Sequence, residues 1–239
     1  MDFYTFEQEF DKYLKKTELR LNSIQKENMY KFMNFLLEKN KVMNLTAITD
    51  EKEIILKHFI DSIIIQKYIE NKYNIVDVGT GAGFPGIPLK IINEENEFLL
   101  LDSLSKRINF INEVVENLNL KNIKAIHSRA EEAGTNNKYR EKFDIATSRA
   151  VSKLNTLVEY MIPFVKVGGE CICLKGPNII SELEESKRAI DVLGGKIKKV
   201  EEFLLPESDI ARTIVIIEKI AHTPKQYPRK AGTPNNKPL

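Results

Sequence analysis

A glycine-rich segment from Asp77 to Gly86 holds the residues of this sequence best suited to binding a ligand: Asp-Val-Gly-Thr-Gly-Ala-Gly-Phe-Pro-Gly. It follows a short apolar run and precedes an apolar helical pattern, and glycines in such a turn let the backbone adopt positive φ and approach a ligand closely. Counted from Gly79, a dinucleotide fingerprint would need its third glycine at position 84, which is Phe84. Asp77 would repel a pyrophosphate and favours a cationic ligand. A tight turn without a ligand is the alternative interpretation.

A second carboxylate, Asp102, ends the next apolar run, Phe98 to Asp102. At the end of that strand the carboxylate would lie where a ribose diol binds. S-adenosylmethionine has a sulfonium, an α-amino acid end and no phosphate, so it fits Asp77, the glycine spacing around Gly81, and Asp102. The sequence therefore predicts S-adenosyl-L-methionine as the cofactor, although either aspartate alone would also suit an ordinary strand-end turn.

Two further loops follow the third and fourth apolar runs. The first contains Ala130 and Glu131 and would cover the adenine of the cofactor, with nearby backbone groups reading its edge. Glu131 would equally suit the first turn of a helix, where a carboxylate is favoured. The second contains Ser148 and Arg149 and would lie over the transferable methyl group. The Asn/Asp-Pro-Pro-aromatic motif of exocyclic-amine methyltransferases is missing there, so the sequence does not indicate that chemistry.

The cysteines and histidines do not suggest a metal site. Cys171 and Cys173 lie two residues apart on the fifth expected strand, so they face the same side and favour core packing over metal binding. That position also does not suit the nucleophile of a cytosine-C5 methyltransferase. The histidines are scattered, at His58, His127 and His222. His58 and Asp61 suit either a helix end with its cap or part of a substrate pocket, and the sequence leaves both open.

The elements that must position these residues alternate between short apolar runs and helical patterns from Asn74 onward. Such alternation predicts parallel strands joined by helices. The gap from Pro206 to Ala211 is too short for a helix, so the last two strands must pair antiparallel. We expect an α/β, class I methyltransferase (Rossmann-like) fold with a mostly parallel seven-stranded sheet. The expected strands span residues 75–78, 98–102, 123–127, 143–147, 170–174, 196–205 and 212–218.

Three segments are expected along the 239 residues: an N-terminal helical extension at 1–68, an S-adenosylmethionine-binding methyltransferase domain at 69–220, and a basic, proline-rich C-terminal tail at 221–239. The net charge of +2 is too small to indicate a partner, but no acidic residue follows Glu218. Composition alone favours a solvated tail over an arm that meets phosphates. The absence of long apolar runs predicts a soluble, cytoplasmic protein that spans no membrane.

Five segments carry a resemblance to a known family: residues 40–46, 57–62, 77–89, 148–151 and 227–234. They resemble the family of bacterial small-subunit ribosomal RNA methyltransferases G (RsmG, also called glucose-inhibited division protein B). The resemblance covers nearly the whole chain, and the Phe-Pro-Gly-Ile-Pro extension of the glycine loop is quite specific. Many members carry tryptophan where this chain has Lys39, and the chain contains no tryptophan.

The resemblance implies methylation of N7 of guanine 527 in 16S rRNA with S-adenosyl-L-methionine as cofactor. It implies that the cofactor contacts Gly79, Phe84, Ala130, Glu131 and Arg149. Guanine N7 carries a free lone pair and needs no deprotonation, so methyl transfer would proceed by in-line attack without a required general base. Catalysis would then be mostly positioning, and no catalytic residue is assigned.

With the resemblance taken into account, contact with RNA becomes the favoured role of the C-terminal tail, ahead of a merely solvated tail. Arg229 and Lys230, held by flanking prolines, would contact phosphates of 16S rRNA or of a small ribosomal subunit particle, and no metal is expected. Two alternatives stay open: a nicotinamide-dependent oxidoreductase on a similar sheet, and a non-catalytic RNA-binding protein that kept the fold. Binding of adenosylmethionine against NAD would separate the first, and an intact glycine loop argues against the second.

Overall fold

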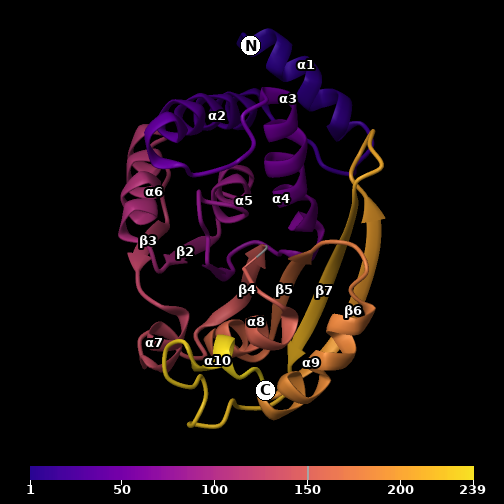
Figure 1. Ribbon diagram of the computed structural model, residues 1–239. Coiled ribbons are helices and arrows are strands. Elements are labelled where there is room, and N and C mark those ends of the chain that lie inside the picture. Colours follow the sequence, from indigo (N-terminus) through magenta and orange to yellow (C-terminus); the bar gives the residue numbers. More distant parts are fainter. Residues whose placement is uncertain (150) are drawn as a thin grey trace.

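A seven-stranded sheet forms the centre of the protein, whose computed structural model describes residues 1–149 and 151–239 (Figure 1). The strand order is β3-β2-β1-β4-β5-β7-β6. Neighbours from β3 to β5 are parallel, whereas β7 runs antiparallel to both β5 and β6. The antiparallel pairing of β6 with β7 is the one that the short gap before the last strand predicted. The strands are β1 (Asn74–Val78), β2 (Glu97–Asp102), β3 (Ile123–His127), β4 (Phe143–Arg149), β5 (Val165–Lys175), β6 (Gly195–Leu204) and β7 (Ala211–Lys219).

Helices cover both faces of the sheet (Figure 1). One face carries α1 (Phe3–Leu14), α2 (Ser23–Met43), α3 (Glu51–Ile54), the π-helical η1 (Ile55–Ile60), α4 (Asp61–Ile63), the 3₁₀ helix η2 (Ile64–Tyr68), α5 (Gly86–Ile92) and α6 (Ser105–Asn117). The other carries α7 (Ala130–Thr135), α8 (Leu154–Met161), the 3₁₀ helix η3 (Ile162–Phe164), α9 (Ile180–Val192) and α10 (Thr233–Asn236). The expected α/β class of fold is therefore confirmed.

Strand alternation explains the two cores. In β1, Ile75 belongs to the hydrophobic cluster under α2 and α5, whereas Val76 and Val78 belong to the cluster under α8 and α9. Successive side chains of a strand point to opposite faces, and a parallel strand between two helical layers is apolar on both. Both cores meet at β1, whose carboxyl end leads directly into the glycine loop.

The N-terminal helices share their core with the sheet. Phe6 and Phe32 are fully buried and pack against Phe59 of η1, which in turn lies 6.1 Å from the ring of Phe84 in the glycine loop. Aromatic pairs at such spacings add to the burial of their area. The helices that precede β1 therefore form one wall against the loop that follows it.

The C-terminal segment, residues 221–239, is not the solvated tail that composition favoured. Tyr227, Pro228 and Pro234 are buried, and the guanidinium of Arg140 donates to the carbonyl oxygens of Tyr227 and Thr223, both over 2.7 Å. The alternative of a solvated tail is wrong, because apolar side chains between the basic ones pack against α7 and α8. Strand pairing does end at Lys219, close to the predicted Glu218.

Candidate functional site

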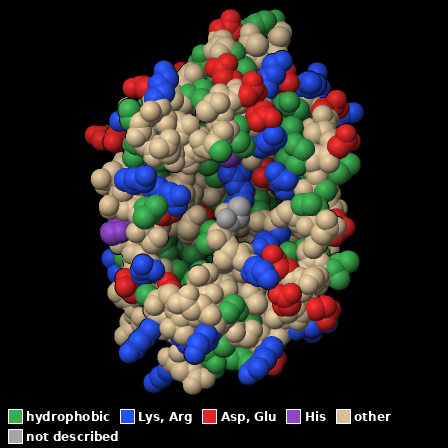
Figure 2. All heavy atoms as spheres, viewed as in Figure 1, with side chains coloured by type: hydrophobic (Ala, Val, Ile, Leu, Met, Phe, Trp, Pro, Cys, Tyr) green, Lys and Arg blue, Asp and Glu red, His purple; other side chains and the backbone are tan. Residues whose placement is uncertain are grey.

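A cavity of about 620 Å³ lies at the carboxyl ends of β1, β2, β3 and β4. This is the edge where ligands bind in open α/β sheets. Its walls come from residues 78–82, Phe84, 101–103, 128–131 and Arg149, and from the C-terminal residues Gly232, Asn235 and Asn236. Figure 2 shows this face of the molecule hollowed near its centre, with Lys and Arg side chains around the hollow.

Most of the predicted site residues meet in this cavity. Gly79, Gly81, Phe84, Asp102, Ala130, Glu131 and Arg149 all line it. Asp77, Arg229 and Lys230 do not. Thr46, His58, Arg107, Tyr160 and Asn235 also line it, although the sequence patterns assigned none of them to the cofactor.

Two glycines in the loop need their positive φ angles. Gly79 has a φ of 73°, and a Cβ there would lie 2.6 Å from a methyl group of Val151. Gly81 has a φ of 61°, but a Cβ there would meet no heavy atom within 4 Å. Side chains other than glycine rarely adopt this backbone region. Gly81 therefore borders open space in the cavity, while Gly79 fixes how closely the loop packs on the segment after β4.

Asp77 lies beneath the loop and not in the cavity. Its side chain is fully buried, and its Oδ2 accepts a hydrogen bond from the backbone N–H of Gly86 over 2.9 Å. Burial raises the pKa of this carboxyl to about 7, because water no longer solvates the charged form. Asp77 therefore does not line the cavity, and a direct contact with a cationic ligand stays a prediction. The residue ties the two ends of the glycine loop together.

Asp102 joins the loop to the end of β2. One carboxylate oxygen accepts from the backbone N–H of Gly81 over 2.9 Å and from Arg107 over 3.2 Å, and the other accepts from the N–H of Leu104 over 2.9 Å. The side chain is nearly buried but borders the cavity. Asp102 is thus a fixed anionic acceptor there, and Arg107, in the first turns of α6, is the cation beside it.

Arg149, at the end of β4, is held on several sides. Its Nη1 donates to the carbonyl oxygen of Lys57 over 3.0 Å and lies 3.4 Å from a carboxylate oxygen of Asp61. Its Cζ sits 5.0 Å from the centre of the Phe84 ring, a cation–π distance. Asp61 also pairs with Arg212 over 3.2 Å, so one buried carboxylate balances two guanidinium groups. Asp61 therefore positions Arg149.

His58 belongs to the pocket, which decides between the two alternatives that the sequence left open. Its Nδ1 lies 3.1 Å from Nη2 of Arg149, and its Nε2 lies 2.8 Å from Oγ1 of Thr46. A guanidinium only donates, so Nδ1 must accept and Nε2 must carry the proton towards Thr46. Burial and the charge of Arg149 lower the pKa of His58 to about 3. The ring is therefore neutral near pH 7, stacked on Phe84 at 4.5 Å.

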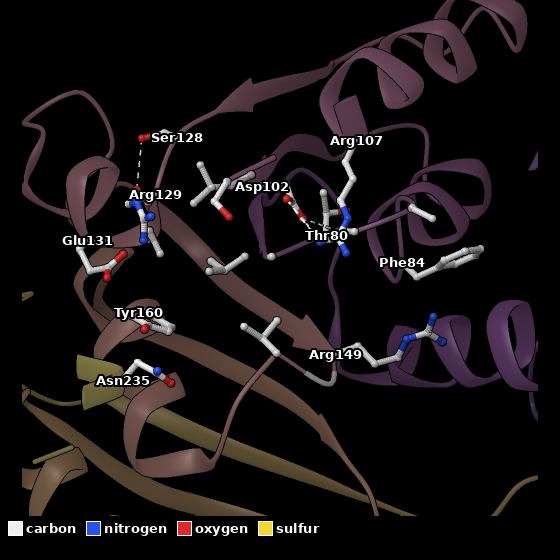
Figure 3. Close-up of a pocket in the computed structure, with 18 of the residues that line it drawn as sticks. Thr80, Phe84, Asp102, Arg107, Ser128, Arg129, Glu131, Arg149, Tyr160 and Asn235 are labelled. Carbon is white, nitrogen blue, oxygen red and sulfur yellow. Dashed lines mark hydrogen bonds and ion pairs between the residues drawn. The ribbon is translucent and has the colours of Figure 1, made fainter. Parts of the chain in front are cut away.

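The opposite end of the cavity is formed by α7 and the C-terminal segment. Figure 3 shows Glu131, Tyr160 and Asn235 together there, away from Phe84 and Arg149. Glu131 lies in the first turn of α7, as one of its two interpretations held, and its Oε1 accepts from the backbone N–H of Gly232 over 2.8 Å. Its carboxylate therefore holds the C-terminal segment, while the nearby backbone borders the cavity.

Arg229 is engaged by the protein itself. Its Nη2 lies 2.6 Å from a carboxylate oxygen of Glu159, and its backbone N–H donates to the same carboxylate over 2.8 Å. Glu159 is fully buried in α8, so this bidentate pair fastens the segment to the fold. The structure thus gives Arg229 a partner that the expectation of a free phosphate-binding side chain did not include. Lys230 beside it is exposed.

Cys171 and Cys173 are buried in the core, as their spacing predicted. Burial raises the pKa of the Cys173 thiol to about 12. Within residues 1–149 and 151–239, no group of three or more His, Cys, Asp or Glu side chains is arranged to hold a metal ion. In the same residues no helix is long and apolar enough to cross a membrane.

The strand order and the position of the cavity are those of the class I methyltransferase fold. Similar solved structures include TYW2 of M. jannaschii in complex with AdoMet, at 18% identity and a TM-score of 0.53, covering 67% of this chain and 77% of that chain. Another is the ribosomal protein L11 methylase of Lactobacillus delbrueckii subsp. bulgaricus, at 16% identity and a TM-score of 0.51, covering 68% and 78%. At such identities the likeness shows the fold.

Sequence comparison gives the family. The family model described as rRNA small subunit methyltransferase G matches residues 25–211. The ribosomal RNA small subunit methyltransferase G of Acetivibrio thermocellus is 53% identical over 222 residues, 92% of this chain and 91% of that protein. That of Lactobacillus johnsonii is 48% identical and covers 96% and 98%. The chain belongs to the ribosomal RNA small subunit methyltransferase G family, which confirms the resemblance seen in its motifs.

Proposed function

We propose that this protein uses S-adenosyl-L-methionine in the cavity to methylate N7 of guanine 527 in 16S rRNA. The observation that carries the proposal is that one cavity, at the carboxyl edge of a methyltransferase sheet, gathers Gly79, Asp102, Ala130, Glu131 and Arg149. These residues come from the ends of four strands, and the chain belongs to a family named for methylation of small-subunit ribosomal RNA.

The residues present fit this cofactor. A volume of about 620 Å³ is within the range of sites for small molecules. The open space beside Gly81 admits a ligand against the loop backbone, and Asp102 offers an acceptor for ribose hydroxyl groups. The backbone near Ala130 and Glu131 would border the purine, and Phe84 and Arg149 would border the methionine end. Asp77 would act only through the loop that it holds.

When bound, S-adenosylmethionine supplies a sulfonium methyl group that the lone pair of guanine N7 attacks in line. The protein's part in such a reaction is orientation, because N7 has no proton to remove. The network around Arg149 supports this. His58 is neutral, with Nδ1 taken by Arg149 and Nε2–H directed at Thr46, so it offers no free basic nitrogen. The residues at this end hold groups in place and do not exchange protons.

The RNA would approach over the mouth of the cavity. Arg107 and Arg129 line it, and the exposed Lys230 lies in the segment that forms its far wall. We propose that Lys230 and Arg229 contact phosphates of 16S rRNA in a small-subunit particle in the cytoplasm. Arg229 would do so while its guanidinium stays paired with Glu159. The partition into a helical extension at 1–68, a catalytic domain at 69–220 and a C-terminal segment at 221–239 is part of the same proposal.

The test is methyl transfer from labelled S-adenosylmethionine to small subunits that lack the modification, with naked 16S rRNA as a second substrate. Chemical cleavage at 7-methylguanine maps the product. The proposal expects one new site at guanine 527, lost when that base is changed to adenine. Calorimetry with NAD in place of S-adenosylmethionine should show no binding. Label at another base or on another atom of guanine would contradict the proposal.

A further inference from the structure

We propose that Asn235, in the C-terminal segment, recognises the adenine of the cofactor, and that the segment is a wall of the cofactor site. This inference rests on the proposed binding of S-adenosylmethionine. It concerns a part of the chain that follows the last strand and that the sequence patterns assigned to RNA or to solvent.

The segment is fastened to the two helices that flank the cavity. Arg229 binds the buried carboxylate of Glu159 in α8, and the N–H of Gly232 donates to Glu131 in α7 over 2.8 Å. The hydroxyl of Thr156, in α8, donates to the carbonyl oxygen of Pro234 over 3.3 Å. These three anchors, the last of them at the residue directly before Asn235, fix the backbone from which its side chain extends.

The position of Asn235 places it at the purine end of the site. Figure 3 shows its carboxamide beside Tyr160, with Glu131 close by and Phe84 and Arg149 on the far side. Asp102, the proposed ribose acceptor, ends β2, and the loop of Ala130 and Glu131 follows the next strand outward. A base attached to that ribose would therefore extend towards Tyr160 and Asn235. Asn235 lines the cavity and is exposed to it.

A carboxamide matches the adenine edge. It presents one acceptor and two donor hydrogens in a plane, which suits the 6-amino group and the neighbouring ring nitrogen together. The carboxylate of Glu131 cannot do the same, because it has no donor and the N–H of Gly232 already occupies one oxygen. Tyr160 offers an aromatic face at the same end. The two-point contact would select adenine over purines without the 6-amino group.

The experiment combines removal of the Asn235 side chain with removal of the 6-amino group from the ligand. Calorimetry measures binding of S-adenosylhomocysteine, and of its analogue with purine in place of adenine, to the wild type and to Asn235→Ala. The wild type should bind the analogue about tenfold more weakly, and Asn235→Ala should bind S-adenosylhomocysteine about tenfold more weakly while no longer distinguishing the two ligands. Lys237→Ala, an exposed change on the next turn, should behave as wild type. Thermal melting shows that each variant is folded.

The outcomes separate the two proposals. A wild type that binds neither ligand would contradict the proposed function itself. A wild type that binds S-adenosylhomocysteine, with Asn235→Ala either at full affinity or still distinguishing the analogue, would overturn the role of Asn235. Equal weakening of both ligands would also overturn it, because Asn235 would then only support the wall.

Discussion

Gly232 donates its backbone N–H to the carboxylate of Glu131 over 2.8 Å, a contact between residues 101 positions apart in the chain. This bond joins the C-terminal segment to the first turn of α7, at the end of the cavity proposed for adenine. Glu131 is a residue that the family resemblance assigns to the cofactor. If Glu131 contacts the cofactor as proposed, its carboxylate connects cofactor binding with the segment that carries Lys230, the proposed RNA contact.

Replacing Asp102 should weaken cofactor binding without unfolding the protein. Asp102→Ala removes a charged acceptor from the proposed ribose site and frees the N–H of Gly81, so affinity for S-adenosylmethionine should fall by about 1–3 kcal/mol. Titration calorimetry measures the change, and Asp191→Ala, an exposed acidic residue in α9, is the matched control. Unchanged affinity in a folded Asp102→Ala protein would refute the ribose assignment.

Removing Arg229 should destabilise the fold strongly. Glu159 is fully buried, so Arg229→Ala leaves a carboxylate without its charged partner, which typically costs about 3–5 kcal/mol. Urea denaturation measures the free energy of unfolding. Lys230→Ala, at the exposed neighbour, should change it by less than about 0.5 kcal/mol. Equal free energies of unfolding for the two variants would contradict a stabilising role of the pair between Arg229 and Glu159.

His58 should make the free energy of unfolding depend on pH in the acidic range. Its folded pKa of about 3 lies below its ordinary value of 6.5, so between these values the unfolded chain binds a proton that the folded chain does not. The contribution of the neutral His58 ring to the free energy of unfolding is fully present above pH 6.5. It is lost as the pH falls towards 3, by up to about 1.4 kcal/mol per pH unit. Urea denaturation of His58→Gln, which cannot titrate, should show a shallower acid slope than the wild type. His127→Gln, at an exposed site, is the control, and equal slopes for wild type and His58→Gln would contradict the half-buried, neutral ring.

Lys230 should contribute to RNA affinity through charge alone. Lys230→Ala removes one phosphate contact, so the slope of log affinity against log salt for 16S rRNA should fall by about 1. The affinity for S-adenosylmethionine should stay as in the wild type. The measurement is a salt titration of binding to 16S rRNA or small subunits. An unchanged slope would mean that this side chain does not meet the RNA.

The sheet and most of the cavity could be predicted because they follow from local patterns. The alternation of apolar runs with helical stripes gave the strands, and the glycine spacing marked the loop after β1. The buried position of Asp77 was not predicted, because strand alternation was not applied to it. Val76 and Val78 point to one face, so Asp77 points to the other, under the loop and towards Gly86.

The contacts of the C-terminal segment could not be read from the sequence. Glu159 looks like a solvent-facing residue of the amphipathic α8, yet it is fully buried and paired with Arg229, 70 positions later. The same holds for His58, whose neutral state depends on Arg149 from another strand end. Such pairings are set by tertiary packing, which local spacing does not encode.

The most direct test of the central claim is to map 7-methylguanine in 16S rRNA from a strain in which the gene for this protein is deleted. Our account predicts that guanine 527 is unmethylated in that strain and that the wild-type gene restores the methyl group. Gly81→Val should not restore it, because a branched side chain would fill the cavity at a position of positive φ. Methylation of guanine 527 that persists in the deletion strain would contradict the account.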